Sequence, residues 1–76
     1  MTTYILYVKY ALQGLLTFKV EVENNWDLFA IIGYLYSTSL EKIERIDYAT
    51  IDHASEETLK TCFDIDCSKV KLTYQK

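Results

Sequence analysis

The chain has 76 residues and a net charge of −3, and half of its residues are apolar, among them seven Tyr, three Phe and one Trp. This length predicts one domain, residues 1–76, and the aromatic side chains supply a core without disulfide or metal support. No segment reaches the roughly 20 apolar residues of a membrane span, and the amino terminus has no leader pattern. We therefore expect no membrane partner. Only two cysteines are present, which favours a reducing, cytoplasmic setting.

The first third of the chain predicts a β-hairpin. Residues 4–11 are rich in Tyr, Ile and Val and apolar on both faces, which predicts an interior strand or one whose outer face is covered. Residues 16–23 alternate between apolar and polar side chains, the pattern of a strand with one buried and one exposed face. Gln13 and Gly14 interrupt the two strands, and we expect Gly14 to adopt a positive φ in the connecting turn.

A helix is predicted from Trp26 to Tyr36. Asn24 and Asn25 provide an N-cap, and apolar residues recur at helical spacing between positions 28 and 35. Gly33 costs the helix about 1 kcal/mol relative to Ala. We expect a close approach to a strand to explain it.

The segment 40–52 admits two interpretations. Thr38 and Glu41 have the spacing of a capping box, which favours a helix. Ile46, Tyr48 and Thr50 alternate with Asp47 and Ala49 and favour a strand. We prefer a strand over 42–51 and keep the helix as the alternative.

The last part of the chain predicts a second helix and a final strand. Ser55 caps a helix over 56–63, and residues 69–74 alternate as a strand. The predicted fold is therefore α+β in the order ββαβαβ, with a mainly antiparallel four-stranded sheet and two helices packed on one face. The expected core residues are Leu16, Phe18, Val20, Leu28, Ile32, Leu35, Leu59, Val70 and Leu72.

No residue pattern predicts catalysis, a metal site or a cofactor. His53 next to Asp52 is more simply an exposed turn residue than a general base. Cys62, Cys67 and His53 lack the paired spacing of structural zinc ligands. Two glycines cannot form a glycine-rich phosphate loop. We therefore expect a protein that is not an enzyme.

The acidic residues suggest a binding function. Between Glu21 and Glu57 nine acidic residues stand against two basic ones, and an acidic surface favours a larger partner with a basic surface. One version is a phage-type inhibitor of a host nucleic-acid enzyme or defence complex, in the anti-CRISPR or DNA-mimic style. The candidate partner-binding residues are Trp26, Tyr34, Tyr36, Glu41, Glu44, Asp47, Asp52, Glu56 and Glu57. Glu41 and Asp47 are expected in one displayed row, with Glu44 paired to Arg45 or Lys42.

Two other functions remain open. The surplus apolar surface would also suit a homo-oligomeric scaffold. Lys9, Lys69 and Lys71 beside Tyr7 would suit weak binding of single-stranded nucleic acid, although the net negative charge disfavours it.

Overall fold

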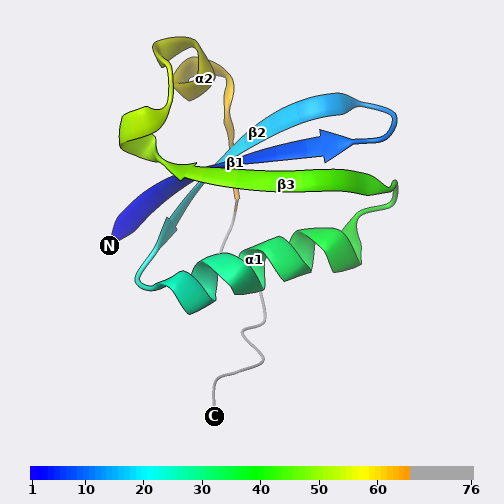
Figure 1. Ribbon diagram of the computed structural model, residues 1–76, viewed down its shortest axis with the longest axis horizontal. Coiled ribbons are helices and arrows are strands. Elements are labelled where there is room, and N and C mark those ends of the chain that lie inside the picture. The colour runs from blue at the N-terminus through cyan, green and yellow to red at the C-terminus, as the bar shows by residue number, and fades with distance from the viewer. Residues whose placement is uncertain (66–76) are drawn as a thin grey trace.

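The computed structural model describes residues 1–65 as a small α+β domain (Figure 1). Its elements are β1 (Thr2–Tyr10), β2 (Gly14–Val22), α1 (Asn25–Thr38), β3 (Ile43–Thr50), the 3-10 turn η1 (Ile51–His53), α2 (Glu56–Thr61) and the two-residue β4 (Phe63–Asp64). The predicted final strand over 69–74, with the core residues Val70 and Leu72, lies outside the described residues. The strand that follows α2 in the structure is Phe63–Asp64.

The four strands form one sheet in the order β3-β1-β2-β4. β1 pairs antiparallel with both β2 and β3, and β4 pairs parallel with β2. The predicted mainly antiparallel sheet and the predicted interior position of the apolar first strand are thus confirmed. Gly14 has a φ of +83° at the hairpin, the positive value expected there.

Residues 43–50 form a strand, which confirms the preferred interpretation of this segment. The Thr38 hydroxyl donates to the Tyr34 carbonyl at 2.7 Å in the last turn of α1. Thr38 therefore ends this helix, whereas the capping box of the alternative interpretation required it to begin a new one. At the other end of α1, the Asn24 side chain accepts a hydrogen bond from the Asp27 amide at 3.0 Å and caps the helix.

The main core lies between α1 and one face of the sheet. Its buried members are Leu6, Val8, Val20, Val22, Leu28, Ile31 and Ile43. Of the predicted core residues, Val20 and Leu28 are buried, while Phe18, Ile32 and Leu35 pack against the cluster from partly exposed positions. Leu16 is half-buried, and Leu59 is exposed.

The opposite face of the sheet carries a second, smaller buried region. Ile5 is completely buried but does not belong to the cluster under α1, and strand alternation points it away from the neighbouring Leu6. η1 contacts β1, and α2 contacts β2. Figure 1 shows α1 on one side of the sheet and η1 with α2 on the other. The prediction that both helices pack on one face is therefore not confirmed.

The topology explains why the helices separate. β2 and β3 are both antiparallel to β1 and hence parallel to each other, and β4 is parallel to both. The connection through α1 crosses from β2 to β3, and the connection through α2 crosses back from β3 to the far side of β2. Because parallel crossovers are almost always right-handed, two that run in opposite directions place their helices on opposite faces.

Candidate protein-binding site

The outer side of α1 is apolar although nothing in the described part of the chain covers it. Trp26, Phe29 and Tyr36 are 68%, 48% and 49% exposed, and their spacing places them along one side of the helix. Gly33 lies between Phe29 and Tyr36 in this row, and a Cβ added there would meet nothing within 4 Å. The expected close contact between Gly33 and a strand is therefore absent. We call Trp26, Phe29, Gly33 and Tyr36 the α1 stripe.

The α1 stripe extends onto the edge of the sheet. The Phe29 ring meets the ring of Tyr48 on β3 edge-on, with centroids 6.2 Å apart. Tyr48 in turn meets Tyr4 on β1 at 5.9 Å, again edge-on. Because Tyr48 is itself about half exposed, the aromatic surface continues from the helix to β3.

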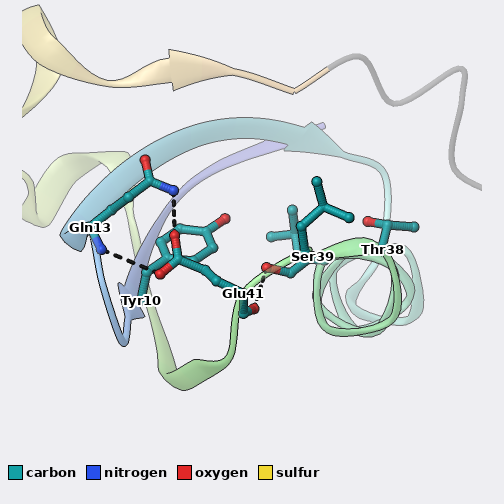
Figure 2. A pocket seen from close by; sticks show the side chains of 7 residues that line it. Tyr10, Gln13, Thr38, Ser39 and Glu41 are labelled. Atoms are coloured by element: carbon teal, nitrogen blue, oxygen red, sulfur yellow. Dashed lines mark hydrogen bonds between the residues drawn. The ribbon is translucent and has the colours of Figure 1, made fainter.

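An open cavity of about 400 Å³ lies at the carboxyl end of α1, next to the hairpin. Figure 2 shows the side chains around it. Apolar walls come from Tyr10, Leu35 and Leu40, and polar groups come from Gln13, Thr38, Ser39 and Glu41. Leu40 is fully exposed at this point. A volume above about 300 Å³ is within the range of ligand sites.

Glu41 connects the loop after α1 to the hairpin. Its Oε2 accepts hydrogen bonds from the backbone amides of Leu12 at 2.7 Å and Gln13 at 3.3 Å, and its Oε1 accepts one from the Gln13 side-chain amide (Figure 2). The Gln13 side chain, with the two backbone amides, holds the pKa of Glu41 below its ordinary value, and partial desolvation opposes this effect. The carboxylate is therefore ionised at neutral pH and fixed in position.

Tyr10 forms the wall of the cavity beside Glu41. Burial of its ring, followed by the negative charge of Glu41, raises the pKa of the Tyr10 hydroxyl. The phenol thus stays neutral at physiological pH and lies within the electrostatic range of the carboxylate. The Ser39 hydroxyl donates to the Glu41 carbonyl at 2.6 Å and fixes the loop from the other side.

The acidic residues proposed as partner-binding do not form one surface. Glu41 lies near the hairpin, whereas Asp52 belongs to η1, and Glu56 and Glu57 open α2, beyond the other end of β3. The structure therefore separates the acidic rim that the sequence suggested into two groups with β3 between them.

Two of the acidic side chains on β3 are paired with cations. Glu44 lies 3.8 Å from the Lys9 ammonium group, where the sequence suggested Arg45 or Lys42. Asp47 lies 2.8 Å from the Arg45 guanidinium group. These exposed ion pairs contribute little to stability, but the second one pairs Asp47, a charge that the sequence placed in the displayed row. They also occupy Lys9, a candidate nucleic-acid contact; Lys69 and Lys71 lie outside the described residues.

The three aromatic candidates differ in accessibility. Trp26 and Tyr36 are exposed on the α1 stripe, whereas Tyr34 packs against the core. Phe29, Tyr48 and Leu40 were not among the partner-binding residues proposed from the sequence. The sequence signal that could have indicated this surface is the absence of any charged residue between Asp27 and Glu41. A helix that is apolar on every side needs a partner to cover the side that the sheet does not.

Among residues 1–65, the other candidate residues His53 and Cys62 lie in η1 and at the end of α2. His53 is exposed in η1, and the Cys62 thiol lies 3.4 Å from the Leu59 carbonyl; Cys67 lies outside the described residues. Within residues 1–65 no three His, Cys, Asp or Glu side chains approach closely enough to hold a metal ion. In the same range no helix has the length and apolar character needed to cross a membrane.

The comparisons add no relative to this description. Neither the protein-family models nor the curated proteins nor the solved structures with which the chain was compared gave a match.

Proposed function

We propose that this protein acts without catalysis by binding another protein, and that the α1 stripe is the centre of the interface. The observation that carries the proposal is the row of Trp26, Phe29 and Tyr36, exposed on a helix that has no charged residue after Asp27. Tyr and Trp dominate the energy of protein interfaces because each buries a large area at little entropic cost.

The shape of the surface supports the same function. An added Cβ at Gly33 would meet nothing within 4 Å, so the surface between the flanking rings is open to a partner side chain. Tyr48 widens the surface towards β3, and the cavity near Glu41 lies at the carboxyl end of the same helix. Interface centres typically combine such aromatic anchors with a pocket for one partner side chain.

A phage-type inhibitor that imitates nucleic acid with a row of carboxylates is a narrower form of this proposal. It receives less support, because the acidic residues are divided between two ends of β3 and two of them are paired with cations. A partner with a basic surface remains part of the proposal at the Glu41 end. Cytoplasmic location also remains a proposal.

Self-association is the second candidate. The α1 stripe is uncharged and would be complementary to the same surface of another copy, in the way that isologous dimers require. A concentration series by light scattering or sedimentation separates the two: a dimer that dissociates on dilution favours self-association, and a monomer up to high micromolar concentration favours a different partner.

The test is affinity capture from a lysate of the source organism with three forms of the full chain. The forms are the wild type, the double variant Trp26→Ala with Tyr36→Ala, and the control Leu15→Ala, which removes an exposed apolar side chain from the sheet face opposite α1. We expect a protein retained by the wild type and the control but lost from the double variant.

A quantitative measurement then follows with the purified partner. Removing two interface anchors should weaken binding by at least about 2 kcal/mol, or roughly thirtyfold, in calorimetry. Equal retention of every captured protein by all three forms would show that the α1 stripe is not the interface.

A further inference from the structure

We propose that the cavity at the end of α1 is a subsite for one cationic side chain, arginine or lysine, of the partner protein. This inference rests on the proposed function and names the chemistry of the residue that anchors the partner. It is carried by three properties of the cavity: an ionised carboxylate without a cation, walls that suit an aliphatic stem, and an aromatic ring beside the carboxylate.

The carboxylate of Glu41 has no ion-pair partner among residues 1–65. The acidic side chains that do form such pairs are Glu44, Asp47 and Asp64. The neutral donors on Glu41 fix its position but leave its charge uncompensated. A carboxylate offers about four acceptor positions on its two oxygens, and these three hydrogen bonds leave one on Oε1 for a donor from outside.

The walls suit the remainder of a long cationic side chain. Lysine and arginine place their methylene groups along apolar surfaces while the charged group reaches a polar partner. Leu35 and Leu40 provide such a surface, and Leu40 projects fully into solvent at the cavity. Burial of Leu40 by the bound stem would remove the most exposed apolar side chain of the described chain from water.

Tyr10 adds a second attraction for a cation. Its ring borders the cavity next to Glu41 (Figure 2), and the face of a tyrosine ring attracts a cation electrostatically. The raised pKa of the Tyr10 hydroxyl, caused first by burial and then by the Glu41 charge, shows that the two groups share one electrostatic environment. A neutral or anionic side chain would gain neither interaction.

The cavity also lies where an anchor is needed. Leu35, Thr38 and Ser39 belong to the last turn of α1 and its cap, so the cavity is continuous with the helix that carries the α1 stripe. A partner that covers Tyr36 can therefore reach Glu41 with a neighbouring side chain.

The test uses the full chain and three blocked tripeptides in which glycine flanks arginine, lysine or citrulline. Citrulline has the shape of arginine without its charge. Two-dimensional amide NMR at low salt follows the backbone signals of Leu12, Gln13 and Leu40 and the side-chain amide of Gln13. We expect saturable shifts at these positions with the arginine or lysine peptide, and at least tenfold weaker binding of the citrulline peptide.

Two variants and one control assign the effect. Glu41→Gln should abolish the preference for the charged peptides, while Glu44→Gln, which removes the same charge outside the cavity, should leave it unchanged. Leu40→Ala keeps the carboxylate and removes only an exposed apolar wall, so it should weaken the binding of both charged peptides. This variant tests the subsite even if Glu41→Gln perturbs the hairpin.

The results that would overturn the subsite are equal binding of arginine and citrulline peptides, absence of saturation, or shifts confined to the acidic groups of η1 and α2. Failure here with successful capture through the α1 stripe would remove the subsite but not the proposed function. The reverse result, peptide binding without any effect of the stripe variants on capture, would remove the stripe interface and leave the subsite.

Discussion

Ile5 provides a direct test of the arrangement in which the two helices cover opposite faces of the sheet. Its side chain is completely buried on the face away from α1, where η1 and α2 are the covering elements. Truncation of a buried Ile to Ala typically costs about 2–5 kcal/mol, and Ile to Val about 0.5–1.5 kcal/mol. A domain of this size has a total stability of only about 4–11 kcal/mol, so Ile5→Ala removes a large share of it.

The assay is urea and thermal unfolding of Ile5→Val and Ile5→Ala, with Leu15→Ala as the control. Leu15 lies on the same face of the sheet but is exposed, so its truncation should cost less than about 0.5 kcal/mol. In a domain of this length each kcal/mol lowers the melting temperature by roughly 4–8 °C. If Ile5→Ala costs no more than Leu15→Ala, then η1 and α2 do not cover this face and the two-sided arrangement is wrong.

Local geometry also predicts the effects of substituting Gly33, Gly14, Asn24 and Glu41. Gly33→Ala should raise stability by up to about 1 kcal/mol, because the helix gains propensity and the added Cβ meets nothing, whereas Gly14→Ala should lower stability in the same unfolding assay because its φ is +83°. Asn24→Ala should cost about 0.5–2 kcal/mol by removing the cap of α1, and Asn24→Ser should restore most of the loss. The pKa of Glu41 is lower in the folded protein than in the unfolded chain, so its stabilising effect is complete above the ordinary value of 4.5 and is lost as the pH falls through the folded pKa. Glu41→Gln should therefore reduce the decrease in the free energy of unfolding at acidic pH. The same variant should lower the pKa of Tyr10 measured by NMR titration, but not to its ordinary value, because burial is the larger cause of the shift; an unchanged Tyr10 pKa would show that the Glu41 charge does not reach the cavity wall.

The local elements could be predicted from the sequence because their signals are local. The period of two in residues 16–23, the glycine at the hairpin and the caps Asn24 and Ser55 each act within a few residues. The apolar character of the first strand on both faces also predicted its interior position. Its burial on both sides, with Leu6 under α1 and Ile5 under the opposite layer, is the direct consequence.

The face that each helix covers could not be predicted in the same way. It depends on the order β3-β1-β2-β4, which sends the two crossovers in opposite directions. Hydrophobic periodicity shows that a helix has an apolar side. It does not show on which face of the sheet that side packs.

The candidate site depended on the tertiary structure for the same reason. In the sequence, Glu41 looked equivalent to Asp47, because both were expected in one displayed row of acidic residues. The fold gives Glu41 the hairpin amides as neighbours and gives Glu44 and Asp47 the cations Lys9 and Arg45. The sequence determined which side chains carry charge, whereas the tertiary structure brought Lys9 of β1 to Glu44 of β3 and placed Glu41 against the hairpin amides at the cavity, because β1 pairs with β3.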